Sequence, residues 1–353
     1  MNKRQQVTLD DIAKRLNVSK VTVSKALRGH PDISRETTRR VKKIAEELGY
    51  SPNYMARNLS SKRTNMIGVV VPKIAHFFFS ALIESIYDTA FHNNYEIALM
   101  VSQENVERER KHIETLLAMR VDGLIISVTE HTRTSAAIEK ARDLSVPVVF
   151  MDRVLEIPGT SKVTVDDRGG ASNAIELAIQ AGYKKIGHLA GYQDINIGRK
   201  RYEGFVDAMK KHDLPINPDW IVHGGFGEDD GYRGFKQILQ NKNLPEFIFA
   251  VTYPVALGMY AAAEEAGLRI PEDVDVICFG TSGFHRFIKP SLTYVDQPTD
   301  VLGRTSVELM LEHLKAVDEH EPKNIEVPTR IVQRETCVRR EPNRKPELIK
   351  NHN

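Results

Sequence analysis

Cysteine and long apolar runs are both scarce in this chain, and each scarcity excludes a class of protein. Among the 353 residues the only cysteines are Cys278 and Cys337, too few for a disulfide framework or for a zinc site made of cysteines. No apolar run approaches the ~20 residues needed to cross a bilayer. The first residues, MNKRQQ, lack the apolar stretch of a signal peptide. We therefore expect a soluble, cytoplasmic protein with no membrane-spanning segment.

Catalytic and cofactor-binding motifs are missing as well. The 12 histidines are scattered and show no metal-ligand spacing such as His-Glu-x-x-His. GTSG at 280–283 lacks the spacing of a nucleophile elbow, and GGFGEDDG at 224–231 has too few correctly spaced glycines for a dinucleotide site. Its acids Glu228, Asp229 and Asp230 are better explained as the first turn of a helix, where negative charge is favourable. We therefore expect no enzyme, no cofactor and no metal ion.

The net charge of +2 hides an uneven distribution of charge along the chain. Residues 1–63 hold 15 Lys and Arg against 6 Asp and Glu, whereas the remaining residues hold 34 against 41. Such an asymmetry indicates a polyanion-binding head on a mildly acidic body.

Residues 8–50 have the pattern of three short helices. Thr8, Ser19 and Ser34 are placed to cap their N-termini, and Gly29 is placed to end the second helix. Apolar side chains at helical spacing are Leu9, Ile12, Ala13, Leu16, Val23, Ala26, Leu27, Val41, Ile44, Ala45 and Leu48. Two short helices joined by a tight turn and locked by a third form a helix-turn-helix unit.

The second of these helices would enter the major groove of DNA with its N-terminus first. Its outward face carries cationic donors and one apolar tip, Val21, which suit guanine acceptors and a thymine methyl group. The side chains of the head expected to contact DNA are Thr8, Ser19, Lys20, Val21, Thr22, Ser24, Lys25 and Arg28. The alternative is a three-helix bundle whose basic surface has no partner.

The sequence of the head continues into a longer pattern. TLDDIAKRLNVSKVTVSKAL, followed by ELGYSPNYMARNLSSKRTNMIGVVVP, resembles the lactose- and purine-repressor (LacI) family, and the resemblance extends along almost the whole chain. It implies a transcription regulator, with repression as the expected action, that binds a pseudo-palindromic site in double-stranded DNA as a homodimer. Lys25 stands where the family usually has arginine, and lysine cannot form the same planar fork. Base discrimination at that position is expected to be softer or different.

Residues 51–64 form a short segment between the head and the body. Ser51-Pro52 is a suitable helix start, but a helix of this length is marginal alone in water. The resemblance implies a hinge helix that folds on DNA as a pair across the dimer, with Leu59 as an apolar wedge in the minor groove. The residues implied to contact DNA here are Asn53, Ala56, Arg57 and Leu59.

From Met66 onward, apolar strands alternate with amphipathic helices. The strand-like runs are residues 66–71, 95–101, 123–128, 147–151, 185–190, 247–252 and 275–279. Nearly continuous apolar strands separated by helices predict parallel sheets covered on both faces. The expected fold class is therefore α/β, with two doubly wound parallel-sheet lobes behind an all-α helix-turn-helix head.

The resemblance implies that both lobes form one clamp, like that of periplasmic binding proteins, and that the chain crosses between them more than once. We expect a head at 1–50, a body at 65–340 and a flexible tail at 341–353. The expected lobes are an N-lobe at about 65–164 and 297–323 and a C-lobe at about 165–296 and 324–340. A transport-type solute-binding protein shares such a body, and the attached DNA-reading head argues against that alternative.

The resemblance also implies a small-molecule effector bound between the lobes. Phe78 and Phe79 resemble the aromatic stacking wall of the family, and Arg201 resembles the arginine that anchors the ligand. The expected effector contacts are Phe78, Phe79, Asp152, Arg153, Asp166, Arg201, Phe226, Tyr253 and Gly280. The alternatives are core packing for the phenylalanines and a surface ion pair for Asp152 and Arg153.

Two positions depart from the sugar-binding members of the family. Where these commonly carry Asn-Asp, this chain has Thr252-Tyr253, and where many carry an acidic turn it has Gly280 in CFGTSGF. Fewer carboxylates leave fewer acceptors for sugar hydroxyls, whereas Arg153 and Arg201 favour an anion. We expect a sugar acid, a phosphorylated sugar or a protein partner. Some family members lose DNA on binding their ligand and others gain it, and this sequence is compatible with either.

Overall fold

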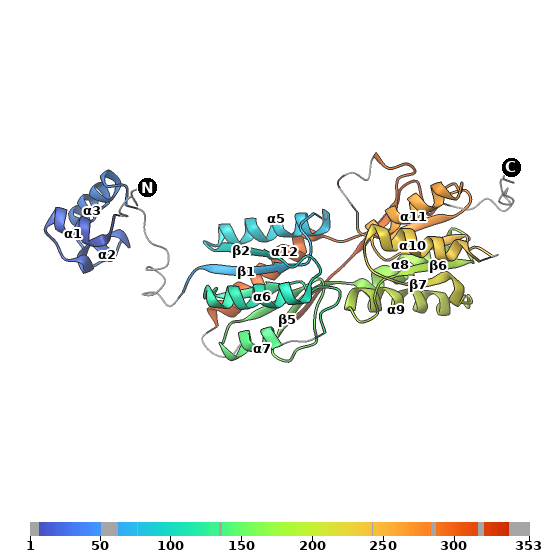
Figure 1. Ribbon diagram of the computed structural model, residues 1–353, viewed down its shortest axis with the longest axis horizontal. Helices are drawn as coiled ribbons and strands as arrows, with labels where there is room; N and C mark the ends of the chain where they lie inside the picture. The colour runs from blue at the N-terminus through green and yellow to red at the C-terminus, as the bar shows by residue number, and fades with distance from the viewer. Residues whose placement is uncertain are drawn as a thin grey trace. The chain divides into compact units, whose positions relative to one another are not determined.

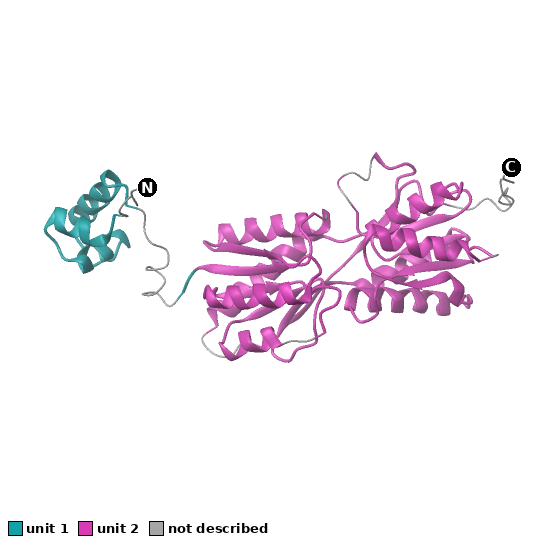
Figure 2. Cartoon of the chain, viewed as in Figure 1, with its two compact units in different colours: residues 1–64 teal, residues 65–353 magenta. Residues whose placement is uncertain are grey.

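The chain separates into two compact units, Met1–Thr64 and Asn65–Asn353 (Figure 2). The structure is a computed structural model, and it describes residues 7–50, 63–75, 77–133, 136–241, 243–281, 283, 287–316 and 321–338. Within those ranges, no helix is both long and apolar enough to cross a membrane. In the same ranges, no three His, Cys, Asp or Glu side chains are grouped so that they could hold a metal ion.

The smaller unit contains a three-helix head. Its helices are α1 Leu9–Leu16, α2 Lys20–Leu27 and α3 Arg35–Glu47. The Ser19 hydroxyl accepts a hydrogen bond from the Thr22 N–H, and the Ser34 hydroxyl accepts one from the Thr37 N–H. These two caps confirm the predicted starts of the second and third helices. Gly29 follows α2 with a φ of 67°, a left-handed conformation that glycine adopts without strain.

Apolar side chains from all three helices close the head. Ile12 of α1, Val23 of α2 and Val41 of α3 are fully buried and belong to one cluster. The helical spacing in the sequence predicts each of them, because residues three and four positions apart share one face of a helix. The predicted helix-turn-helix head is thereby confirmed.

The larger unit contains two lobes, each built on a six-stranded sheet with helices on both faces (Figure 1). The N-lobe sheet has the strand order β11-β5-β4-β3-β1-β2, and every neighbouring pair is parallel. Helix α5 packs on α12, and α6 packs on α7. The bounds are β1 Met66–Val71, α5 Phe77–His92, β2 Glu96–Val101, α6 Val106–Ala118, β3 Gly123–Ile126, α7 Ala136–Asp143, β4 Val148–Met151, β5 Ser161–Val165, α12 Thr299–Lys315 and β11 Asn324–Val327.

The C-lobe repeats this architecture. Its strand order is β12-β10-β9-β8-β6-β7, and the β10–β12 pair alone among these neighbours is antiparallel. Helix α8 packs on α9, and α10 packs on α11. The bounds are α8 Asp167–Gln180, β6 Ile186–Ala190, α9 Asn196–Lys211, η1 Pro218–Trp220, β7 Ile221–His223, α10 Glu228–Leu239, β8 Phe247–Ala250, α11 Tyr253–Glu265, β9 Asp275–Phe279, β10 Thr293–Asp296 and β12 Arg330–Val332. The α/β fold class with two doubly wound lobes is confirmed.

The described chain crosses between the lobes after β5, after β10 and after β11. The expected start of the last C-lobe segment at residue 324 is wrong. Strand β11 pairs in parallel with β5 and so belongs to the N-lobe, and β12, from Arg330, is the first C-lobe element that follows it. The reason is that the backbone groups along the outer side of β5 need hydrogen-bond partners. The Lys162 N–H donates to the Lys323 carbonyl, and the Asp166 N–H donates to the Val327 carbonyl.

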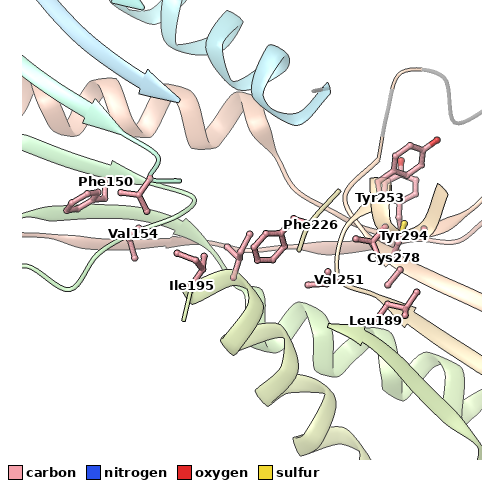
Figure 3. Packing of buried hydrophobic residues seen from close by; sticks show 14 of the residues in the cluster. Phe150, Val154, Leu189, Ile195, Phe226, Val251, Tyr253, Cys278 and Tyr294 are labelled. Carbon is pink, nitrogen blue, oxygen red and sulfur yellow. The ribbon is translucent and has the colours of Figure 1, made fainter. Parts of the chain in front are cut away.

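One apolar cluster joins the two lobes. It includes Phe150 and Val154 of the N-lobe and Leu189 of the C-lobe. In Figure 3, Ile195 and Phe226 lie between these two groups. The lobes therefore share buried surface beside the point where the strands end, and the aromatic ring of Phe226 is part of that surface.

Candidate functional site

The exposed face of α2 is the first candidate site, because it presents side chains expected to contact DNA. Lys20, Val21 and Arg28 are exposed, and Val21 has 63% of its surface accessible. Thr22 and Lys25 are half-buried beside them. An apolar side chain that extends so far from a small head is available to contact a thymine methyl group.

Two cations of this face are held by carboxylates of the head. Lys20 Nζ lies 3.2 Å from a carboxylate oxygen of Asp10, and Lys25 Nζ lies 2.8 Å from one of Asp32. Exposed ion pairs contribute about 0–1 kcal/mol to stability. Phosphate or base acceptors can therefore replace these carboxylates at little cost.

The remaining residues expected at this face have local structural partners. Ser19 caps α2, and its Oγ lies 2.8 Å from Thr22 Oγ1. The Ser24 carbonyl and hydroxyl accept hydrogen bonds from the Arg28 guanidinium at 3.2 and 3.0 Å. Thr8 precedes α1, and its N–H donates to a carboxylate in the first turn of that helix. These contacts hold Thr8 at the start of α1, Ser19 at the start of α2 and Arg28 at the end of α2.

The head also contains a basic groove that the sequence analysis did not single out. It has a volume of about 520 Å³ and is lined by Gly29, His30, Pro31, Ile33, Arg35, Thr38, Arg39 and Lys42. Arg35, Arg39 and Lys42 lie on one face of α3 and, within the described part of the head, form no ion pair. The signal was present in the sequence as three cations at positions i, i+4 and i+7.

The four contacts predicted for the hinge are Asn53, Ala56, Arg57 and Leu59. All four lie outside the residues that the structure describes. Their roles stay predictions from the resemblance.

The second candidate site is a cavity of about 390 Å³ in the larger unit. Both lobes line it, at the ends of their strands, which is where doubly wound sheets bind ligands. The residues that line it are Lys73, Ala75, Phe77, Phe78, Phe79, Glu104, Asp152, Arg153, Ile197, Arg201, Phe226, Gly227, Glu228, Thr252, Tyr253, Pro254, Leu257, Phe279, Gly280, Thr281, Ile288 and Gln297.

The cavity brings together eight of the nine expected effector contacts. They are Phe78, Phe79, Asp152, Arg153, Arg201, Phe226, Tyr253 and Gly280. Asp166 is absent from the lining. It caps α8 instead, because its carboxylate accepts the Gly169 N–H at 2.7 Å. Residues that the sequence analysis missed include Glu104, whose backbone φ of 56° belongs to a turn with no recognisable motif.

Arg201 is fixed inside the C-lobe. Its Nε donates to Asp167 at 2.8 Å and its Nη1 to the Val251 carbonyl at 2.7 Å, and its guanidinium lies 3.8 Å from the centroid of the Phe279 ring. Arg201 and Asp167 are both buried. Burial raises the pKa of Asp167, and the charge and hydrogen bond of Arg201 oppose that rise. Most of the positive charge of Arg201 is therefore already balanced within the protein.

Arg153 is held at the junction of the lobes. Its Nη1 donates to both carboxylate oxygens of Glu104, at 2.9 and 3.1 Å. Its guanidinium lies 5.9 Å from the Phe79 ring centroid in the N-lobe and 4.9 Å from the Phe226 ring centroid in the C-lobe. Its Nε is buried and has no hydrogen-bond partner. A buried donor without a partner is costly, so this atom lowers the stability of the body.

Asp152 follows β4 directly, in a setting that is unfavourable for a carboxylate. Its backbone φ is 59°, in the left-handed region, and its buried side chain is 3.5 Å from the Ser127 hydroxyl. Burial raises the pKa of Asp152 to about 6, against the lowering effect of the charges of Arg153 and Arg201. A buried acid with a perturbed pKa in a cavity wall is typical of a ligand site.

Replacing Asp152 with asparagine is expected to stabilise the body at pH 8 by about 3 kcal/mol. The folded-state pKa, about 6, lies above the ordinary value of 3.8. The stability tied to the protonated carboxyl is therefore present below about pH 4 and lost as the pH rises through about 6. An amide is neutral throughout and tolerates the left-handed φ.

The gain from this substitution should accordingly vanish near pH 4. Urea unfolding at both pH values, followed through the fluorescence of Trp220, the single tryptophan of the chain, measures the difference. A variant that is no more stable than the parent at pH 8 would contradict the expectation.

Polar contacts also link the two lobes beside the cavity wall. The Val154 N–H donates to Asn196 Oδ1 at 2.9 Å, and Asn196 Nδ2 donates to the Asp152 carbonyl at 2.8 Å. Arg133 of the N-lobe forms an ion pair with Asp194 of the C-lobe at 2.7 Å. Asn196, the first residue of α9, therefore ties the C-lobe to the N-lobe backbone on both sides of Arg153.

A helix-turn-helix head joined to a two-lobed body with a ligand cavity defines the class of ligand-responsive transcription regulators. Residues 8–53 match the profile of bacterial regulatory proteins of the lacI family. Residues 64–335 match that of periplasmic binding proteins and the sugar-binding domain of the LacI family. The chain belongs to the LacI family.

Individual relatives cover nearly the whole chain. The HTH-type transcriptional repressor PurR of Pasteurella multocida is 34% identical over 312 residues, which are 88% of this chain and 93% of that protein. Catabolite control protein A of Priestia megaterium is 31% identical over 87% of this chain and 92% of its own length. The crystal structure of the lac repressor dimer bound to operator and the anti-inducer ONPF has a TM-score of 0.82 at 26% identity, and the match covers 95% of this chain and 100% of that one.

Proposed function

We propose that this chain represses transcription by binding a pseudo-palindromic site in double-stranded DNA as a homodimer, under the control of a small molecule bound between its lobes. The observation that carries the proposal is the presence, in one chain, of an exposed donor face on α2 and a ligand cavity between two lobes. The lac repressor structure, a dimer with both an operator and an anti-inducer, supports it.

The DNA contacts divide into base reading and phosphate binding. Lys20, Val21, Thr22 and Lys25 read base edges in the major groove. The basic groove of α3 supplies phosphate contacts, which carry affinity but little sequence information. In the hinge, Leu59 enters the minor groove, with Asn53, Ala56 and Arg57 beside it.

Two chains pair through their bodies, N-lobe to N-lobe and C-lobe to C-lobe, which sets two α2 helices at the spacing of two half-sites. An exposed apolar face of α5 supports pairing of the N-lobes. Tyr87 and Phe91, one turn apart, have 50% and 64% of their surfaces accessible, and large aromatic side chains are enriched at protein interfaces.

The effector acts by changing the relative orientation of the lobes. Through the paired N-lobes, this change controls whether the hinge helices can pair. Such a coupling between two sites is typically about 1–3 kcal/mol. We propose a sugar derivative with an anionic group, such as a sugar acid or a phosphorylated sugar, as the starting class. The chain acts by binding and not by catalysis, because its cavity side chains fit the holding of a ligand and its relatives are repressors.

Selection from random double-stranded DNA tests the proposal. The full chain and a chain that lacks residues 1–63 are each incubated with the pool at about 0.1 M salt. We expect the full chain alone to enrich a palindrome. Enrichment of the same sequence by the truncated chain would refute DNA binding through the head, whereas enrichment by neither chain would point to a ligand or partner that DNA binding requires. Recovery of the protein from the periplasm would favour a solute-binding protein instead.

A further inference from the structure

We propose that Asp10 and Asp32 raise the sequence specificity of the head by keeping two lysines of α2 from binding DNA phosphates. The inference rests on the proposed DNA-binding function and adds to it two residues that determine specificity. Both carboxylates form an ion pair with a lysine that is proposed to read bases, Asp10 with Lys20 and Asp32 with Lys25.

Each of the two carboxylates comes from a different element of the head. Lys20 Nζ lies 3.2 Å from an oxygen of Asp10, in the first turn of α1. Lys25 Nζ lies 2.8 Å from an oxygen of Asp32, in the turn between α2 and α3. The Asp32 N–H donates to His30 Nδ1 at 3.4 Å, which ties the acid to that turn. The hydrogen bond and charge of Lys25 lower the pKa of Asp32, so its carboxylate is ionised at neutral pH.

The cations of the basic groove on α3 have no such partner. Arg35, Arg39 and Lys42 form no ion pair within the described part of the head. These three side chains are proposed to bind phosphates, whereas Lys20 and Lys25 are proposed to read bases. The pairing with a carboxylate therefore follows the proposed division between phosphate contacts and base contacts.

A lysine that is paired with a carboxylate can still read a base. An ammonium has three N–H donors, so a lysine that gives one to a carboxylate keeps two for the neutral acceptors of a guanine. A phosphate is an anion, and the nearby carboxylate repels it and cancels the attraction of the ammonium. Asp10 and Asp32 therefore lower the affinity for DNA of any sequence more than they lower the affinity for the correct bases.

Binding of the full-length protein to a random-sequence DNA duplex tests the inference. Asp10→Asn and Asp32→Asn each release one lysine to a phosphate. One more released counterion steepens the slope of log K against log salt by about 0.9, and it strengthens binding by about 8-fold at about 0.1 M salt. We expect both changes in each variant. Fluorescence anisotropy of a labelled duplex, between about 0.05 and 0.2 M salt, measures them.

Two further variants separate the release of a lysine from a change in net charge. Glu46→Gln removes the same charge from an exposed residue of α3 that forms no ion pair within the described head. Because this control releases no cation, it should leave the slope unchanged and strengthen binding by less than about 2-fold. Asp32→Asn/Lys25→Gln should return the slope to that of the parent, because the released cation is gone.

The palindrome obtained by selection measures the effect on specificity. On that site Lys20 and Lys25 already donate to bases, so Asp10→Asn and Asp32→Asn should strengthen binding by less than about 2-fold. The ratio of the affinity for the palindrome to that for the random duplex should therefore fall by at least about 4-fold in each variant. An unfolded head cannot mimic this result, because it would weaken binding to both DNAs.

Three outcomes would overturn the inference. The slopes of both aspartate variants could equal that of the parent, the palindrome could gain as much affinity as the random duplex, or the double variant could keep the slope of Asp32→Asn. The random duplex needs no selected site, so the slopes decide the inference separately from the selection. A palindrome enriched by the full chain together with unchanged slopes would remove the role of the two carboxylates and leave the DNA-binding function in place.

Discussion

Replacing Arg201 with methionine is expected to lower the free energy of unfolding of the body by about 3–5 kcal/mol. The change leaves the Asp167 carboxylate buried without its cation and the Val251 carbonyl without its donor. It also removes the guanidinium from the face of the Phe279 ring. Coulombic attraction in a buried pair only offsets the cost of burying both charges, so loss of one partner exposes that cost in full.

The neighbouring residue provides a matched control. Lys200 is half-buried, and its ion pair with the exposed Glu326, at 3.3 Å, is partly screened by solvent, so Lys200→Met should cost at most about 1 kcal/mol. A third variant, Arg201→Met/Asp167→Leu, should recover much of the lost stability, because no uncompensated charge stays buried. Urea unfolding through Trp220 fluorescence compares all three. Equal stabilities for the Arg201 and Lys200 variants would show that the buried pair contributes nothing.

Replacing Ile12 with alanine is expected to weaken specific DNA binding by about 100-fold and to leave the body unchanged. Ile12 is fully buried in the single apolar cluster of the described head. Loss of a buried isoleucine typically costs about 2–5 kcal/mol, and a domain as small as this head has little stability to spare. The head should unfold for much of the time, and affinity for the selected site should fall by about 100-fold, which corresponds to about 2.7 kcal/mol.

A variant of the exposed residue Val21 distinguishes a loss of head stability from a loss of base recognition. Val21→Ala removes an apolar tip that has 63% of its surface accessible, so the head should keep its stability while its base preference changes. The unfolding transition of the body, followed by Trp220 fluorescence, should be the same in the Ile12→Ala variant, the Val21→Ala variant and the parent. The reason is that Trp220 lies in the other compact unit. An Ile12 variant that still binds the selected palindrome with full affinity would show that the head is far more stable than its core suggests.

The sequence predicts strands well where both faces of the strand are buried. β1 reads MIGVVV and is buried along almost its whole length, and its apolar run marks it plainly. The strands that the sequence analysis did not name are short or partly polar, such as β7 with IVH and β11 with NIEV. Both lie at the edge of a sheet, where one side of the strand needs no neighbour and the sequence carries little apolar signal.

For the candidate site, the sequence predicted which residues line the cavity but not which side chains they pair with. The resemblance placed Asp152, Arg153 and Arg201 at the cavity, and all three line it. The expectation of an anionic effector rested on the charges of the two arginines. That reasoning missed their carboxylate partners, because Asp167 is 34 positions from Arg201 and Glu104 is 49 from Arg153. Periodicity describes neighbours along an element, whereas these pairs are made by the packing of separate elements.

The order in which the chain visits the lobes bears on its synthesis. The N-lobe sheet is completed by β11, Asn324–Val327, and the C-lobe sheet by β12, Arg330–Val332. During synthesis each sheet therefore lacks one edge strand until residues 324–332 are made, whereas the helices of the head are complete by Glu47. Premature termination between Glu47 and Asn324 would release a complete helix-turn-helix head attached to a body in which both sheets lack an edge strand.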